Sequence, residues 1–134
     1  MKKGFTLLEL IVVIVIIGIL GTLGFTQYGR TIERTRTAEA KMLLGTVRRA
    51  QQAYKHEYGG YSSAMGNLAV EVPTTTCTST HYFTYSSDGT TGTATRCTTG
   101  GKTPTAGTAY TITVTYSSGV WGGSAGYYYK SKIL

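Results

Sequence analysis

The sequence predicts an α+β fold in which one long N-terminal α-helix packs on a small antiparallel β-sheet of three or four strands. Two observations support this prediction. A helical pattern, first apolar and then amphipathic, runs from residue 5 to about residue 58, and short β-prone segments separated by turns follow it. Consecutive strands that are joined by short turns pair in the antiparallel sense. At 134 residues, the chain is expected to form one small domain on a helical anchor rather than two domains.

The apolar part of the predicted helix is long enough to cross a membrane. Residues 10–29 contain no charged side chain, and about 20 such residues span the roughly 30 Å of a bilayer core. Lys2 and Lys3 precede the run, as in a secretory signal peptide, but the run is longer than an ordinary signal sequence and no A-x-A site precedes Arg30. A signal peptide, a plain membrane anchor and a leader that is cut early are therefore three alternative interpretations.

The first residues of the chain favour the early cut. The stretch Lys3-Gly4-Phe5-Thr6-Leu7-Leu8-Glu9 resembles the processing site of type IV prepilins and of their pseudopilin relatives. The resemblance implies that the prepilin peptidase, which is also a methyltransferase, cleaves after Gly4 and methylates the new amino-terminal residue, Phe5. It further implies a pilin fold whose apolar helix is first a membrane helix and later the core of a filament.

The resemblance and the composition together divide the chain into four parts. A leader peptide occupies residues 1–4, and a hydrophobic transmembrane and filament-core helix follows at 5–29. An amphipathic continuation of the helix covers 30–58, and a globular head with an αβ-loop and the antiparallel sheet covers 59–134. Because basic residues flank both ends of the apolar run, their distribution does not decide its orientation. The resemblance implies a cytoplasmic N-terminus with the head outside the cytoplasm.

Glu9 has two expected roles. The spacing Thr6-x-x-Glu9 fits a capping box, in which the two residues satisfy free N–H groups at a helix start. The resemblance adds that Glu9 meets the methylated amine of Phe5 on a neighbouring subunit and so sets the register of assembly. A buried carboxylate needs such a cationic partner, because an unpaired buried charge is strongly unfavourable.

Gly18, Gly21 and Gly24 recur every three residues within the apolar run. Each glycine weakens a helix interior by about 0.8–1 kcal/mol relative to alanine, whereas small residues allow helices to approach closely in lipid. We therefore expect these glycines to serve helix packing or flexibility. Members of the resembled family usually have a proline where Thr26 stands, so whether the helix melts between Gly18 and Thr26 in a filament stays open.

The amphipathic continuation is expected to pack on the sheet through a stripe of residues at helical spacing. This stripe consists of Leu43, Val47, Ala50, Tyr54 and Tyr58. Gly59-Gly60 is a strong signal for the end of the helix. A helix from about Thr6 to His56 would be roughly 75 Å long, which suits a subunit that reaches across its neighbours.

From Gly60 onward the composition shifts to Thr, Ser, Gly and Tyr. A connecting loop is predicted for 61–80, with a helical turn near 64–68. Strands are predicted at 81–85, 93–98 and 110–116, with a last strand within 126–133. The segment 110–116 shows strict alternation, which predicts that its apolar residues share one face of the sheet. These residues are Tyr110, Ile112, Val114 and Tyr116.

Cys77 and Cys97 are the only cysteines, and both fall in the predicted head. In an oxidising compartment, such a pair is more typical of a disulfide than of a metal site. The bridge would tie the loop before the first strand to the end of the second strand. By the chain-entropy model, it would stabilise the head by about 3 kcal/mol.

Several functional classes find little support. The sequence has no G-x-S-x-G, H-E-x-x-H or P-loop motif, and Asp88 stands in a Ser-Asp-Gly turn. We therefore expect no enzyme activity, no catalytic residues, no cofactor and no metal site. Removing Lys2 and Lys3 lowers the net charge from +7 to +5. The remaining head cations are scattered, so no specific nucleic-acid partner is predicted. Those cations are Arg96, Lys102, Lys130 and Lys132.

The resemblance favours a structural subunit, most similar to a major type IVa pilin, that polymerises into an extracellular pilus filament through its N-terminal helices. The alternative is a pseudopilin of a type II secretion or DNA-uptake system that forms a short periplasmic pseudopilus. Major secretion pseudopilins carry an acid-rich C-terminal calcium loop, whereas this chain has no acidic residue after Asp88.

The implied partners are further copies of the chain, the prepilin peptidase and methyltransferase, the inner-membrane pilus assembly platform and, before assembly, the lipid bilayer. The implied location is the inner membrane for the single-pass precursor and the cell surface for the fibre.

Overall fold

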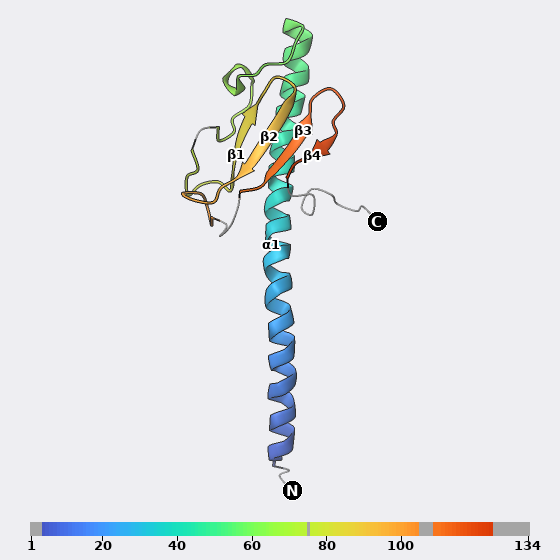
Figure 1. Cartoon of the computed structure of the whole chain (residues 1–134), viewed down its shortest axis with the longest axis vertical. Coiled ribbons are helices and arrows are strands. Elements are labelled where there is room, and N and C mark those ends of the chain that lie inside the picture. The colour runs from blue at the N-terminus through green and yellow to red at the C-terminus, as the bar shows by residue number, and fades with distance from the viewer. Residues whose placement is uncertain (1–3, 75, 105–108, 125–134) are drawn as a thin grey trace. The chain divides into compact units, whose positions relative to one another are not determined.

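The structure is a computed structural model that describes residues 4–74, 76–104 and 109–124. Its helices are α1 (Leu7–Tyr58) and the short 3₁₀ helix η1 (Met65–Asn67). Its strands are β1 (Phe83–Ser87), β2 (Thr91–Arg96), β3 (Thr111–Thr115) and β4 (Trp121–Gly122) (Figure 1). The chain divides into two compact units, one that ends at Arg34 and one that begins at Thr35. The predicted α+β class, with a long N-terminal helix and an antiparallel sheet, is confirmed.

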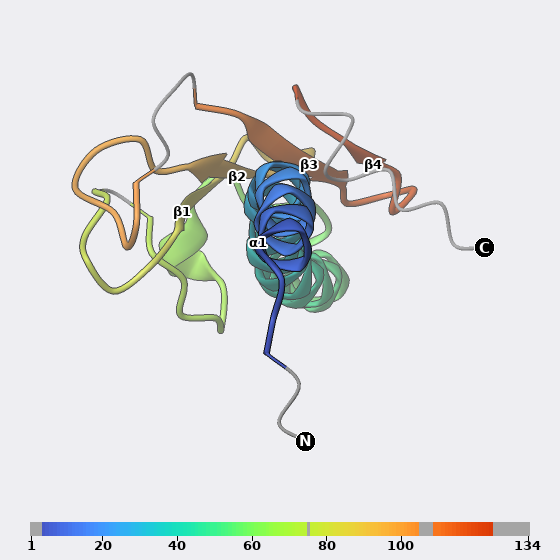
Figure 2. The same ribbon diagram turned by 90° about the horizontal axis from the view of Figure 1, so that it is seen from below.

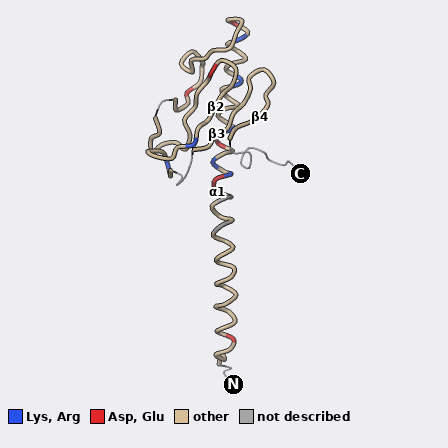
Figure 3. The backbone as a smooth tube through the Cα atoms, in the orientation of Figure 1, with Lys and Arg blue, Asp and Glu red and all other residues tan. Residues whose placement is uncertain are grey.

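The first unit is the apolar part of α1. Within the described residues, α1 is the one helix long and apolar enough to cross a membrane, and none of its apolar window is buried. Figure 3 shows no blue or red along α1 between Glu9 and the arginine-rich stretch that follows the apolar run. This uncharged and exposed surface differs from that of a core helix, whose apolar side would be buried.

α1 ends where the sequence predicts. Gly59 adopts a left-handed conformation with φ of +80°, and its N–H donates to the Lys55 carbonyl at 2.8 Å. Glycine enters this region without a steric penalty, which makes it the usual residue just after a helix. The predicted helical turn near residues 64–68 is η1, a single 3₁₀ turn.

The second unit contains the sheet. Its strands follow the order β1-β2-β3-β4, and every neighbouring pair is antiparallel. The prediction of three or four antiparallel strands is therefore confirmed, although β1 begins at Phe83 rather than at residue 81 and β2 begins at Thr91 rather than at residue 93. Residues 81 and 82 lie outside the ladder: the His81 ring makes its contacts in the preceding threonine-rich turn.

The fourth strand is one that the sequence analysis missed. β4 is only two residues long and follows a turn in which Gly119 has φ of +73°. It pairs Trp121 with Val114 and Gly122 with Thr113. So short a strand carries no alternation pattern that a sequence could show. The segment predicted to be the last strand, 126–133, lies outside the described residues.

Residues 35–58 of α1 cover one face of the sheet, and Figure 2 shows the strands to one side of the helix. The predicted alternation in β3 is confirmed, since Ile112, Val114 and the following Tyr116 are fully buried. The core is completed by residues of α1, η1 and the first two strands. It comprises Ala40, Leu44, Val47, Met65, Leu68, Phe83, Tyr85, Ala94, Ile112, Val114 and Tyr116.

The buried stripe of α1 is turned slightly from the predicted one. Ala40, Leu44, Val47 and Gln51 are fully buried, whereas Tyr58 is 64% exposed and stacks on Tyr54 with ring centres 4.4 Å apart. The prediction that Tyr58 packs on the sheet is wrong. A polar residue completes the buried stripe because its amide is fully used: Gln51 donates to the Ser62 carbonyl at 2.7 Å and accepts from the Ser62 N–H at 2.9 Å.

Candidate functional site

The start of α1 is held by a reciprocal capping box. The Thr6 N–H and the Thr6 hydroxyl donate to the same Glu9 carboxylate oxygen at 2.8 and 2.9 Å, and the Glu9 N–H donates to the Thr6 hydroxyl at 3.2 Å. Thr6 is thus the N-cap of a helix whose first residue is Leu7. The capping role expected of Glu9 is confirmed.

The predicted processing residues lie just ahead of this cap. Gly4 and Phe5 precede α1, and both are exposed, with Phe5 at 88%. A peptidase needs an accessible segment outside a helix, because helical backbone groups are already bonded to one another. The structure therefore places Gly4, Phe5 and Glu9 together at one end of α1, with the Gly4–Phe5 bond outside the helix.

The apolar side chains in the first half of α1 are exposed. Every large hydrophobic side chain from Leu7 to Phe25 is at least 49% exposed. At Gly18, Gly21 and Gly24, an added Cβ would meet no atom within 4 Å. The helix therefore carries three unfavourable glycines that bring no packing advantage against the part of the chain that the structure describes. The Thr22 hydroxyl donates to the Gly18 carbonyl at 2.6 Å, so the hydroxyl of this polar residue is hydrogen-bonded within the helix itself.

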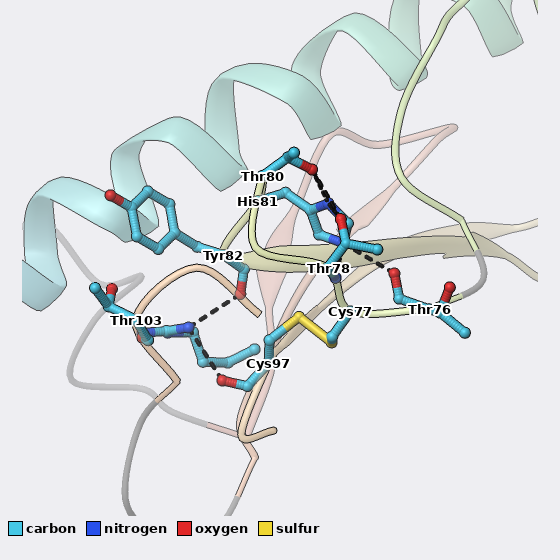
Figure 4. The surroundings of a disulfide bond; sticks show 9 residues. Thr76, Cys77, Thr78, Thr80, His81, Tyr82, Cys97 and Thr103 are labelled. Carbon is cyan, nitrogen blue, oxygen red and sulfur yellow. Dashed lines mark hydrogen bonds between the residues drawn. A yellow bond between two sulfur atoms is a disulfide. The ribbon is translucent and has the colours of Figure 1, made fainter. Parts of the chain in front are cut away.

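The disulfide predicted between Cys77 and Cys97 is present, with Cα atoms 5.8 Å apart. It joins the loop before β1 to the residue after β2, as the sequence analysis expected. Figure 4 shows His81 beside the bridge, among threonines of the same turn. The His81 ring bonds to the Thr76 carbonyl at 3.0 Å and to the Thr78 hydroxyl at 3.2 Å. This histidine therefore organises a turn.

Arg96 is a structural residue that the sequence analysis misjudged. The sequence places it among the scattered cations of the head, yet its side chain is 1% exposed. Its guanidinium donates to the carbonyls of Tyr82 and Cys97, each at 3.1 Å, and to that of Thr103 at 2.8 Å. It also lies over the Phe83 ring at 5.6 Å. Arg96 therefore fastens the disulfide-bearing loop to the start of β1 and is too deeply buried to contact a nucleic-acid phosphate. Its signal in sequence is an arginine at an inward-facing position of an alternating strand.

Asp88 forms the turn between β1 and β2. Its carboxylate accepts hydrogen bonds from the N–H groups of Thr90 and Thr91 at 2.8 and 2.6 Å. The bonds from Thr90 and Thr91 lower the pKa of the Asp88 carboxyl below its ordinary value of 3.8. In the core, burial raises the pKa of the Tyr85 hydroxyl, and the negative charge of Glu39 raises it further. Among the described residues, no group of three His, Cys, Asp or Glu side chains is arranged to hold a metal ion.

Comparison with known proteins adds two matches. The family model described as type IV pilin-like G and H matches residues 37–126, which is more than half of the chain. The model of the prokaryotic N-terminal methylation motif matches residues 1–25. Searches of curated proteins and of solved structures gave no match. The boundary between the two matches falls where the structure divides: the methylation motif lies in the unit that ends at Arg34, and the pilin-like match lies in the unit that begins at Thr35.

Proposed function

The chain belongs to the type IV pilin-like family, and we propose that it is a structural subunit that polymerises into an extracellular pilus filament through packing of its N-terminal helices. The observation that carries this proposal is the exposed apolar surface of α1 from Leu7 to Phe25. Such a surface is unfavourable in water, at about 25 cal/mol for each Å² of apolar area left exposed. A lipid bilayer covers it before assembly, and neighbouring helices cover it in the filament.

The glycines support packing between subunits. Gly18, Gly21 and Gly24 present backbone without side chains, and no atom of the described residues lies within 4 Å of a Cβ added at any of them. Small residues of this kind let two helices approach closely and exchange van der Waals contacts. In a filament, the free energy of these contacts offsets the lower helix propensity of the three glycines relative to alanine.

Processing prepares the N-terminus for assembly. Cleavage after Gly4 by a prepilin peptidase would create a new amine on Phe5, four residues ahead of the Glu9 carboxylate. The methylated amine keeps its positive charge, so Phe5 of one subunit can pair with Glu9 of the next. This contact replaces water around both charges and selects one register among the many in which two smooth apolar helices could pack.

The alternative assignment within the family is a pseudopilin that forms a short periplasmic pseudopilus. The two assignments differ in where the assembled chain is found. Cells that express the chain are sheared, and the sheared fraction and the envelope are probed separately with an antibody against the head, together with electron microscopy. Antibody-labelled filaments in the sheared fraction are the expected result. If the chain is found only in the envelope and no filament is labelled, the result would contradict an extracellular fibre and favour the pseudopilin.

A further inference from the structure

The face of the sheet that points away from α1 carries almost only hydroxyl side chains. Residues that pair across neighbouring strands share one face, and the buried Ile112 and Val114 mark the face that packs on residues 35–58 of α1. Figure 1 looks onto the opposite face, with the second half of α1 behind the sheet. Its positions on the four strands hold Gly122 and eight threonines or serines, which we call the hydroxyl face: Thr84, Ser86, Thr91, Thr93, Thr95, Thr111, Thr113 and Thr115.

The strand register aligns these hydroxyls in rows that cross the sheet. One row consists of Thr84, Thr95 and Thr111, and the next consists of Ser86, Thr93 and Thr113. Neighbours within a row are about 4.8 Å apart, and the rows are about 6.6 Å apart, because these are the spacings between strands and between alternate residues of a strand. Gly122 follows Thr113 in its row, and a Cβ added there would lie 2.8 Å from the Thr113 hydroxyl oxygen. Glycine at this position therefore leaves the hydroxyl uncovered.

Most hydroxyls of this face are available to a ligand. The Thr111 hydroxyl contacts the Ser124 hydroxyl at 3.4 Å. Among the described residues, the other seven hydroxyls form no hydrogen bond, and no buried side-chain oxygen lacks a partner, so solvent reaches all seven. On the inward face, by contrast, the Ser87 hydroxyl donates to the Ser62 carbonyl at 2.8 Å. The hydroxyls of the head that serve the fold and those that remain accessible are thus separated by face.

The hydroxyl face is also uncharged. None of the outward positions on the four strands holds Asp, Glu, Lys or Arg, whereas about 25–35% of the surface positions of a soluble protein are expected to be charged. The β propensity of threonine favours this residue in strands, but it does not require every outward position to be neutral. A surface without charge offers no attraction to a polyanion or an anionic membrane and suits a neutral partner.

The shape of the face favours a flexible chain over a flat solid. Adjacent strands of a sheet are rotated by about 20–25°, so the three strands that carry the hydroxyls turn by about 40–50° in total. A flat crystalline surface cannot follow this turn, but a single polymer chain can. The spacing within a row is close to the advance of one sugar along an extended β-linked polysaccharide. Sugar hydroxyls donate and accept hydrogen bonds as threonine does, and the threonine methyl groups can pack against the C–H groups of the sugar rings.

We propose that the hydroxyl face binds a neutral, extended β-linked polysaccharide whose chain lies along the rows. This inference goes beyond the proposed function and shares with it only a head that lies outside the cytoplasm. A hydrogen bond between neutral groups changes affinity by a factor of only about two to ten, so one head binds weakly. A filament repeats the face in every subunit, and such multivalency makes the binding of a long polysaccharide tight.

The test is affinity electrophoresis of the full chain in neutral detergent. Native gels contain increasing amounts of soluble mixed-linkage β-glucan, a neutral β-linked polysaccharide, and the retardation of the band gives the dissociation constant. We expect the β-glucan to retard the wild type. Thr93→Val/Thr95→Val/Thr113→Val keeps the side-chain shape and the β propensity but removes three hydroxyls from the centre of the face. This variant should bind about ten times more weakly, or worse.

Two further variants serve as controls. Thr74, Thr76 and Thr99 are exposed and lie outside the strands, so Thr74→Val/Thr76→Val/Thr99→Val removes as many hydroxyls and should bind like the wild type. Thr93→Ser/Thr95→Ser/Thr113→Ser keeps the hydroxyls without the methyl groups and should retain most of the retardation. Circular dichroism and the absence of free thiols establish that each variant is folded.

Three outcomes would overturn the inference. One is a wild type that the β-glucan does not retard, and another is equal retardation of the wild type and the central valine variant. The third is retardation by dextran sulfate alone, which would assign binding to cations of the chain. Binding in detergent does not require polymerisation, so the proposed function is tested separately. Filaments that ignore the β-glucan contradict only the hydroxyl face, whereas a chain that binds it without forming filaments contradicts only the pilus subunit.

Discussion

The backbone N–H and the hydroxyl of Thr6 both donate to one oxygen of the Glu9 carboxylate, at 2.8 and 2.9 Å. Glu9 therefore caps the helix of its own chain, independently of any contact with a neighbouring subunit. A carboxylate has two oxygens and about four acceptor positions, so the cap leaves room for a second partner. The capping and pairing roles of Glu9 can be separated, because one needs only an acceptor and the other needs a negative charge.

Glu9→Gln separates these two roles. The amide oxygen of glutamine still caps the helix at this position, but the neutral side chain cannot pair with the Phe5 amine as an ion. We expect the variant to be processed normally and to yield at least tenfold fewer filaments, measured by electron microscopy and by the amount of chain in the sheared fraction. Thr6→Ala is the matched control, since it disrupts the cap and keeps the charge. Abundant filaments from Glu9→Gln would show that pairing with a charge is unnecessary.

Loss of the disulfide should destabilise the segment between Cys77 and Cys97. Cys77→Ser opens a loop whose ends are 20 residues apart in sequence, which corresponds to about 3 kcal/mol by the chain-entropy model. We expect trypsin to cleave the variant within residues 76–104 at least ten times faster than the wild type. Ser79→Ala, an exposed change in the same loop, should digest like the wild type. Equal digestion of Cys77→Ser would show that the bridge adds no stability.

Replacement of Arg96 should be costly because three backbone carbonyls depend on it. Arg96→Met keeps much of the side-chain volume but leaves buried acceptors without donors, at about 1–3 kcal/mol for each unsatisfied group. Arg96→Lys keeps the charge but lacks the planar fork, so it should recover only part of the loss. Urea unfolding of the full chain in detergent, followed by near-ultraviolet circular dichroism, measures both variants. Urea midpoints equal to that of the wild type would show that the hydrogen bonds of Arg96 add no stability.

Asp88 should make the head sensitive to acid. Its folded pKa lies below the ordinary 3.8, so its contribution to stability is present above that value and is lost as the pH falls through the folded pKa. Asp88→Asn keeps a side-chain acceptor for the turn but does not titrate. The drop in unfolding midpoint between pH 6 and pH 2.5 should therefore be smaller in Asp88→Asn than in the wild type. Equal drops would exclude this carboxylate as a source of acid sensitivity.

The features that could be predicted from the sequence depend on local patterns. Gly59 ends the helix through its own conformational freedom, and the alternation of Ile112 and Val114 follows from the pleat of a strand. Thr6 and Glu9 are only three residues apart, so their capping box is visible in the sequence as well. Each of these features is decided by neighbours along the chain.

The features that could not be predicted depend on partners far away in sequence. Gln51 is buried because the backbone of Ser62 satisfies its amide, and Arg96 is buried because Thr103 and Tyr82 supply carbonyls. The helical spacing of Tyr58 predicts a core position, but the residue stacks on Tyr54 in the last turn of α1 and is mainly exposed. Residue type and helical period alone contain no information about these contacts.

The intact mass of the chain recovered from sheared filaments tests the central claim most directly. The account predicts a chain that begins at Phe5, heavier by the one CH2 that N-methylation adds and lighter by the two hydrogens lost in the disulfide. Sequencing from the amino terminus should find N-methylated phenylalanine. A chain that still begins at Met1, in filaments or in the membrane, would contradict processing at Gly4 and would leave Glu9 without its proposed partner.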